Sequence, residues 1–193
     1  MAPPDTGSAH GLSGGELGPL AGDRRALDHL FSATYEELRR LASSVRRSDP
    51  ASTLSPTTLV NEAWLKLRNS PELASLSRVH FKRIAARAMR QVLIEAARRR
   101  KAGKRGGGQI ALVTFDDALD QPVTGAEELL ALDDALEALA RIEPRQAIMV
   151  ETRFFGGLDV AETAELLGVS EATVLRDWRA ARAWLAHELR RAG

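Results

Sequence analysis

Apolar residues recur at every third or fourth position through most of the chain from residue 23 to residue 191. This spacing places them on one face of an α-helix and leaves the other face polar. The one stretch with β-strand character, QIALVTF at residues 109–115, has no second strand to pair with. The pattern therefore predicts an all-α protein.

Two breaks in this periodicity divide the chain. Residues 1–22 are rich in Gly, Pro and Ser and carry few large apolar groups, which is typical of a disordered tail. Three consecutive glycines at residues 106–108 and a turn-rich acidic stretch after them predict a flexible linker over residues 101–124. We therefore expect two small helical domains, at residues 23–100 and 125–193.

The formal net charge of +1 hides a difference between these two blocks. Residues 23–105 contain 19 Lys and Arg against 8 Asp and Glu, a net charge of +11, whereas residues 128–193 contain 8 against 12, a net charge of −4. A block this basic favours a polyanionic partner such as nucleic acid. The opposite charges also favour packing of the two domains on each other when no other partner is bound.

Composition excludes several classes of protein. The chain has no cysteine, which excludes disulfide scaffolds, thiolate metal sites and cysteine nucleophiles and fits a reducing cytoplasm. No stretch approaches the roughly 20 apolar residues of a membrane span. The 4 histidines are scattered, and the chain has neither a phosphate-binding loop between a strand and a helix nor a nucleophile elbow. We therefore expect no enzymatic activity, no catalytic residue, no metal and no cofactor.

The C-terminal block has the layout of a helix-turn-helix. Asp159 is a good N-cap with Glu162 three residues later, Gly168 begins a tight turn, and Ser170 caps the final helix. In that helix the core-facing positions are Val174, Trp178, Ala181 and Leu185. Ordinary corners between two helices share this layout, so the motif alone leaves DNA binding and simple packing equally open.

The surrounding sequence resembles a known family. The segment from Arg141 to Leu185 looks like the C-terminal promoter-reading domain of bacterial sigma factors of the extracytoplasmic-function (ECF) type. The matching residues are Pro144, Arg145, Arg153, Phe154, Gly157, Glu162, Ala164, Leu167, Gly168, Val169, Ser170, Thr173, Val174, Ala181, Arg182 and Leu185. In the basic block, TLVNEAWLKL is similar to the segment that docks on the polymerase, and FKRIAARAMRQVLIEAARRR to the helix that binds and opens the promoter. The two motifs stand in the family's order, and the resemblance covers residues 23–191.

The resemblance implies a factor that binds core RNA polymerase and directs promoter-specific transcription initiation. In the family picture, the domain at residues 23–100 holds the polymerase and reads the −10 element, and the domain at residues 125–193 reads the −35 element. By that picture the polymerase contact falls on Leu59, Val60, Asn61 and Glu62, beside Trp64. Packing in the core is the alternative for the apolar members, so Asn61 and Glu62 are favoured.

The resemblance also assigns two sets of DNA contacts. The −10 set is Lys82, Arg83, Arg87, Arg90, Gln91, Arg98, Arg99 and Arg100, whose cations would neutralise phosphates. The −35 set is Ser170, Glu171, Thr173, Leu175, Arg176 and Arg179, because the N-terminal residues of a recognition helix reach base edges. A merely solvated face is the alternative for the first set, and a first-turn acid favoured by the helix dipole is the alternative for Glu171.

Two other classes of protein fit parts of the sequence. One is a two-domain helix-turn-helix transcriptional regulator that does not act as a sigma factor, but its sensor or dimerisation domain would have no reason to be so basic. The other is a helical interaction protein that binds no promoter DNA. For a sigma factor, the sequence leaves open whether an anti-sigma factor or the protein's own tail and linker restrain it.

Overall fold

The computed structural model describes residues 19–47, 54–103 and 125–192. This part of the chain forms seven α-helices and one 3-10 helix and contains no strand, so the all-α prediction is confirmed. The stretch QIALVTF and nearly all of the predicted tail and linker lie outside the described residues. The helices are α1 (Pro19–Arg47), α2 (Pro56–Leu67), η1 (Pro71–Ser75), α3 (Arg78–Gly103), α4 (Ala126–Ile142), α5 (Pro144–Gly156), α6 (Val160–Leu167) and α7 (Glu171–Ala192).

Two helices extend beyond the boundaries expected from the sequence. Helix α1 begins at Pro19, inside the stretch predicted as a tail, because proline is well tolerated in the first turn of a helix. Helix α3 continues to Gly103, past the predicted start of the linker at residue 101. Lys101 and Ala102 are strong helix formers, so the helix persists until the glycine-rich stretch begins.

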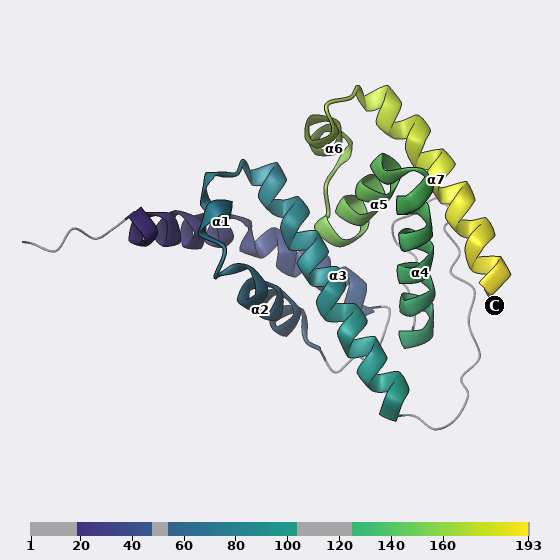
Figure 1. The fold of residues 1–193 in the computed structure, drawn as a ribbon, viewed down its shortest axis with the longest axis horizontal. Coiled ribbons are helices and arrows are strands. Elements are labelled where there is room, and N and C mark those ends of the chain that lie inside the picture. The colour runs from purple at the N-terminus through teal and green to yellow at the C-terminus, as the bar shows by residue number, and fades with distance from the viewer. Residues whose placement is uncertain (1–18, 48–53, 104–124, 193) are drawn as a thin grey trace, which may run out of the picture.

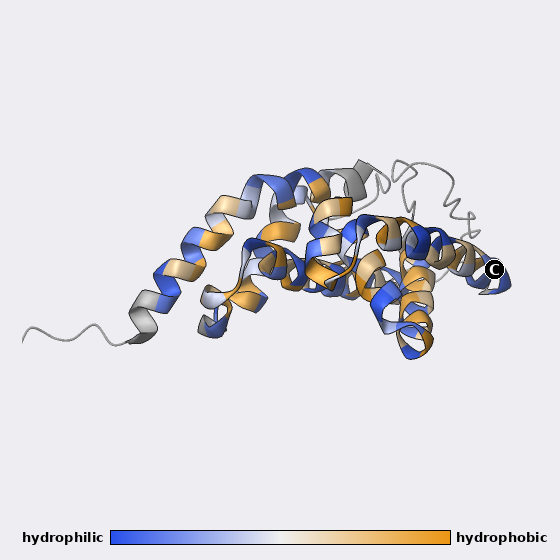
Figure 2. Ribbon diagram, turned by 90° about the horizontal axis from the view of Figure 1, so that it is seen from above, coloured by the Kyte–Doolittle hydropathy of each residue, from blue (hydrophilic) through white to orange (hydrophobic). Residues whose placement is uncertain are grey.

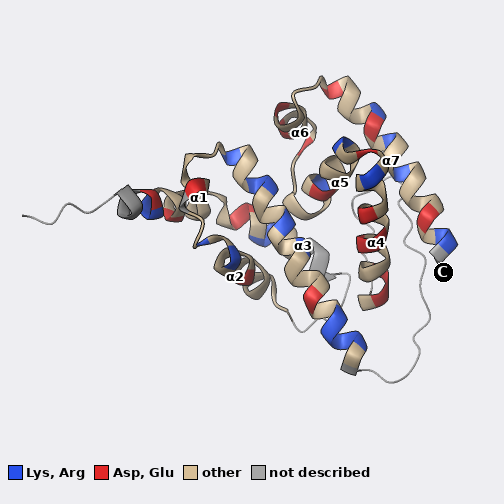
Figure 3. Ribbon diagram, in the orientation of Figure 1, with Lys and Arg blue, Asp and Glu red and all other residues tan. Residues whose placement is uncertain are grey.

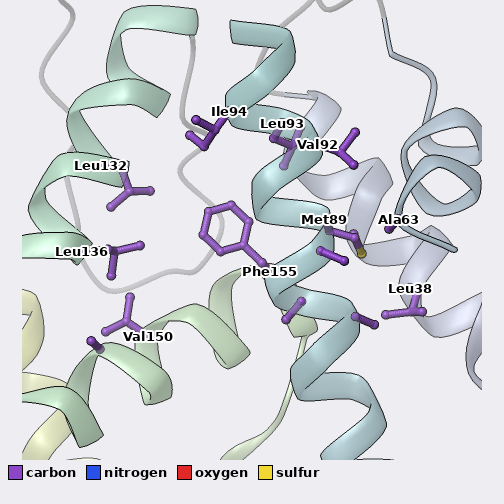
Figure 4. Packing of buried hydrophobic residues seen from close by; sticks show 14 of the residues in the cluster. Leu38, Ala63, Met89, Val92, Leu93, Ile94, Leu132, Leu136, Val150 and Phe155 are labelled. Atoms are coloured by element: carbon purple, nitrogen blue, oxygen red, sulfur yellow. The ribbon is translucent and has the colours of Figure 1, made fainter. Parts of the chain in front are cut away.

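Helix α3 lies at the centre of the fold, with α1 and α2 on one side and α4 and α5 on the other (Figure 1). Phe81 and Met89 on α3 are completely buried. Phe155 reaches from α5 into the space between α3 and α4, where it faces the leucines of α4 (Figure 4). The buried residues of both predicted domains therefore form one continuous hydrophobic core.

The predicted apolar stripes are the buried faces of the helices. Hydrophobic and hydrophilic residues alternate along the helices, as expected for amphipathic helices that share a core (Figure 2). In α4 the apolar stripe is buried along its whole length; it consists of Leu129, Leu132, Leu136 and Leu139. Helix α7 packs on α4, α5 and α6 through its own apolar face, which closes the C-terminal half of the fold.

Local signals fix where several helices begin and end. Ser55 is the N-cap of α2 and accepts a hydrogen bond from the backbone N–H of Thr58 at 3.0 Å. Helix α5 ends at Gly157, whose φ of 62° is in the left-handed region that glycine adopts without strain. The glycine pair at residues 156 and 157 therefore stops the helix.

Candidate nucleic-acid interface

Helices α6 and α7 are joined by a short, well-specified turn. Asp159 and Glu162 form a capping box at the start of α6: Asp159 Oδ1 accepts from the Glu162 N–H at 2.8 Å, and Glu162 Oε2 accepts from the Asp159 N–H at 3.1 Å. Gly168 ends α6 with a φ of 62°. Ser170 then accepts a hydrogen bond from the N–H of Thr173 at 3.2 Å, so the chain enters α7 with a defined direction.

The first turns of α7 present the predicted −35 residues to solvent. Ser170, Glu171, Leu175, Arg176 and Arg179 are exposed, and Thr173 is half-buried. The opposite side of the helix is fixed in the core, because Val174, Ala181 and Leu185 are buried and Trp178 is half-buried. The outward face of α7, defined by the six predicted residues, is therefore held in position by its inward face and is free to meet a ligand.

A buried carboxylate connects this outward face to α5. Asp177 accepts a hydrogen bond from Arg145 Nη2 at 2.6 Å, and its other oxygen accepts from Arg176 Nε and Nη2 at 3.3 Å each. Asp177 therefore orients Arg176 as well as binding Arg145. Arg145 is a functional neighbour that reasoning from α7 alone misses, although it is one of the residues that carry the family resemblance.

Arg153 of α5 holds the other edge of α7. Its guanidinium lies over the ring of Trp178, 4.6 Å from the ring centroid, in a cation–π contact. Nε and Nη1 of Arg153 are buried and have no hydrogen-bond partner among the described residues. Burial lowers the pKa of Arg153, against an opposing influence of Asp159. The contact with Trp178 joins α5 to α7.

The structure buries the first predicted −10 residue, Lys82 of α3. Its Nζ donates to both carboxylate oxygens of Glu162, at 2.7 and 2.9 Å, and lies 3.2 Å from Oε2 of Glu37. Because Glu37 belongs to α1 and Glu162 to α6, one ammonium group joins three helices. A lysine that is only 3 % exposed requires such partners, since an unpaired buried charge is very costly.

Arg90, one further predicted −10 residue, is paired in the same way. Its guanidinium donates to Asp133 at 2.8 Å, to Glu151 at 2.7 Å and to Glu137 at 3.3 Å. Burial lowers the pKa of Arg90, but the hydrogen bonds and charges of Glu151 and Asp133 outweigh it, and the pKa is raised overall. Arg98 adds a weaker contact to Asp133 at 3.4 Å.

The remaining predicted −10 residues line or flank a groove. This groove of about 760 Å³ lies between α3, α4 and α5, with Arg83, Arg87 and Gln91 on its α3 side. Asp133, Glu137 and Glu151 line the facing side. Figure 3 shows the basic residues along α3 and the acidic residues of α4. Beyond the groove, Arg99 is exposed and Arg100 is half-buried near the end of α3.

The residues of α2 that are predicted to contact polymerase lie on two different faces of the helix. Leu59 and Val60 are buried against the core, whereas Asn61 and Glu62 are exposed. Leu65 is 49 % exposed and lies one turn beyond Asn61 on the same face. The sequence prediction does not include Leu65, although the spacing of four residues from Asn61 is a signal that could have found it.

The described residues hold no cluster suited to a metal ion. No group of three or more His, Cys, Asp or Glu side chains is placed so that it could hold a metal ion anywhere in residues 19–47, 54–103 and 125–192. Within the same ranges, no helix is both long enough and apolar enough to span a membrane. The features that stand out are therefore surfaces of charge: the outward face of α7 and the groove beside α3.

Comparison with known proteins gives one match. The family model described as ECF sigma factor matches residues 20–191, which include every described helix apart from the end residues of α1 and α7. No curated protein and no solved structure matches the chain.

Proposed function

Because the chain belongs to the family of ECF sigma factors, which act in transcription initiation, we propose that it binds core RNA polymerase and directs the enzyme to specific promoters. The observation that carries the proposal is the family match over residues 20–191, which takes in the basic block as well as the C-terminal helices. A regulator that shares only a helix-turn-helix would match the C-terminal helices alone. The family is one of transcription factors and not of catalysts.

We assign recognition of the −35 element to the outward face of α7. Supporting this, α6 and α7 are joined by a turn at Gly168, and the predicted contact residues lie at the exposed start of the second helix. Arg176 can read guanine or hold a phosphate, and Glu171 can accept from a cytosine amine. Because residues 128–193 carry a net charge of −4, this part of the chain would bind DNA weakly alone and would need polymerase to hold it there.

We assign binding of the −10 element to the basic side of α3. Arg87, Gln91 and Arg99 are exposed and Arg83 is half-buried, and these four side chains are available for phosphates and bases. Lys82 and Arg90 can join them only if their carboxylate partners move away. Binding at this side should weaken steeply with added salt, because phosphate neutralisation releases counterions.

We assign polymerase docking to the exposed side of α2. Asn61, Glu62 and Leu65 form a small mixed surface of one apolar and two polar side chains. Leu59 and Val60 support this surface from below as part of the core, so they position the contact rather than make it.

The test is transcription in vitro from fragmented genomic DNA with bacterial core RNA polymerase and the purified chain. We expect discrete transcript starts that share a promoter sequence and that core polymerase alone does not give. If the chain binds DNA fragments tightly in the absence of polymerase but adds no transcript starts, it is a helix-turn-helix regulator and the proposal fails.

A further inference from the structure

We propose that Leu175 of α7 recognises the C5-methyl group of one thymine in the −35 element, so that this position is read by an apolar contact and not by a hydrogen bond. The inference rests on the proposed function of α7, and it names the base that this residue selects. It predicts that thymine is distinguished from uracil, and 5-methylcytosine from cytosine, at a single position of the promoter.

Leu175 is one of few large apolar side chains on the surface of this protein. It is 42 % exposed, and among the described residues only Leu65 and Ile142 are large apolar residues with a similar or greater exposure. Single exposed leucines are common on protein surfaces, so exposure alone assigns no role. What distinguishes Leu175 is its place on α7.

Leu175 stands among the residues assigned to the −35 element. Glu171 and Arg179 lie one helical turn before and after it, on the same side of α7, and both are exposed. Ala172, three residues before it, is exposed as well. The side chains in the first turns of a recognition helix are those that reach the edges of bases in the major groove. Leu175 is therefore placed to meet a base edge.

The core holds Leu175 in this outward position. Its neighbour Val174 is 1 % exposed, and Ala181 and Leu185 on the same inward face are completely buried. Asp177 adds a polar anchor, because it accepts a hydrogen bond from Arg145 of α5 at 2.6 Å. Helix α7 cannot turn to bury Leu175 without pulling Val174 out of the core, so Leu175 is covered only when a partner binds.

The chemistry of leucine selects the group that it meets. Its side chain has no hydrogen-bond donor or acceptor, and the C5-methyl group of thymine is the apolar group on the base edges of the major groove. Against guanine, adenine or cytosine, Leu175 would cover donors and acceptors without pairing with them, which is unfavourable. An outward leucine in this helix therefore favours thymine over the other three bases.

The other outward residues are less suited to this contact. Thr173 also carries a methyl group, but it is half-buried, and its hydroxyl is paired with that of Ser170 at 3.0 Å. Ala172 has a single methyl group close to the backbone and so reaches less far than leucine. Arg176 is charged and lies against Asp177. Leu175 is thus the outward residue that combines an apolar side chain with length.

Three variants isolate the contact. Leu175→Ala removes it, whereas Leu175→Met keeps an apolar side chain of similar volume and should preserve it. Alanine and methionine are both strong helix formers, so neither change disturbs an exposed position of α7. The matched control is Ile142→Ala, which removes an exposed apolar side chain at the end of α4, outside α7.

The probe is a promoter fragment in which each thymine of the −35 element, on either strand, is replaced singly by deoxyuridine. Uracil pairs with adenine as thymine does and lacks only the methyl group. The readout is the affinity of the complex of chain and core RNA polymerase for the substituted fragment relative to the unsubstituted one, measured by competition. Because the two fragments are compared with the same variant, any change in polymerase binding cancels.

We expect one thymine at which loss of the methyl group weakens binding about fourfold, the effect of removing one buried methyl group, or about 0.8 kcal/mol. Wild type, Leu175→Met and Ile142→Ala should all show this loss, and Leu175→Ala should stay within about 1.5-fold. At the same position, paired with guanine, 5-methylcytosine should bind wild type about fourfold more tightly than cytosine, and Leu175→Ala should not distinguish the two.

The outcomes separate this inference from the proposed function. Methyl recognition is wrong if wild type tolerates uracil at every −35 position, if Leu175→Ala keeps the loss seen with wild type, or if 5-methylcytosine binds no more tightly than cytosine. The sigma function then still stands on the transcript starts.

The opposite result is also defined. If the chain adds no transcript starts but binds DNA fragments without polymerase, the same substitutions are made in those fragments. A methyl effect that Leu175→Ala abolishes then upholds this inference while the sigma function fails. If the chain neither directs transcript starts nor binds DNA, both are wrong.

Discussion

Asp177 of α7 lies 2.6 Å from Arg145 of α5, so a largely buried carboxylate of α7 is anchored by a cation of the helix on which α7 packs. The other carboxylate oxygen of Asp177 accepts a hydrogen bond from Arg176, which is exposed. The same side chain thus holds α7 on α5 and steadies one of the residues expected to meet DNA. Removal of the Asp177 carboxylate should therefore lower the free energy of unfolding more than it changes the selection of DNA sequences.

We predict that Asp177→Ala lowers the free energy of unfolding by about 2 kcal/mol, because it leaves Arg145 without its charged partner and removes a buried hydrogen bond. Urea denaturation followed by circular dichroism measures the change. Asp134→Ala, at an exposed carboxylate of α4, is the matched control and should stay within about 0.5 kcal/mol of wild type. Equal effects of the two substitutions would show that the anchor is unimportant.

The conformation of Gly168, in the turn between α6 and α7, predicts how its substitution changes stability. Its φ of 62° is unfavourable for alanine, whereas a Cβ there meets nothing within 4 Å, so the only penalty is in the backbone. We expect Gly168→Ala to cost about 1 kcal/mol and Gly168→Asn clearly less, because asparagine tolerates this conformation. The ranking of the two urea midpoints tests this, and a more stable alanine variant would contradict the assigned turn.

The two faces of α2 predict two different phenotypes. Asn61→Ala/Glu62→Ala should weaken binding to core RNA polymerase about tenfold without altering the midpoint of unfolding, because both side chains are exposed. Leu65→Ala should behave in the same way. Leu59→Ala should instead lower the free energy of unfolding by about 2–5 kcal/mol, as for other buried leucines.

Native gel titration against core polymerase and urea denaturation separate these effects. The assignment would be contradicted if Leu59→Ala, at a temperature where it is fully folded, lost affinity for polymerase while Asn61→Ala/Glu62→Ala kept it. The docking surface would then not be the exposed side of α2.

Local features of the fold could be predicted from the sequence, and contacts between the halves could not. The capping box of Asp159 and Glu162 and the helix end at Gly157 depend on residues a few positions apart, so a short pattern reveals them. Lys82 and Glu162 are 80 positions apart, and Arg90 and Glu151 are 61 apart. The opposite charges of the two blocks indicated attraction, but no short pattern states which cation meets which carboxylate.

The same limit explains the placement of the predicted −10 residues. In a helix of basic composition, the spacing identifies the apolar stripe but treats every cation beside it as exposed. Lys82 follows the buried Phe81 and is covered because α1 brings Glu37, and α6 brings Glu162, to its ammonium group. Leu65 shows the opposite case, an apolar residue of α2 that stays exposed.

We propose above that the outward face of α7 selects promoters while the chain is bound to polymerase. The most direct measurement maps transcript 5′ ends from genomic DNA with core polymerase and either wild type or Arg176→Ala/Arg179→Ala. We predict that wild type gives starts preceded by a shared −35 sequence, and that the double variant loses these starts while binding core polymerase with unchanged affinity. Identical transcript starts from wild type and the double variant would contradict the account.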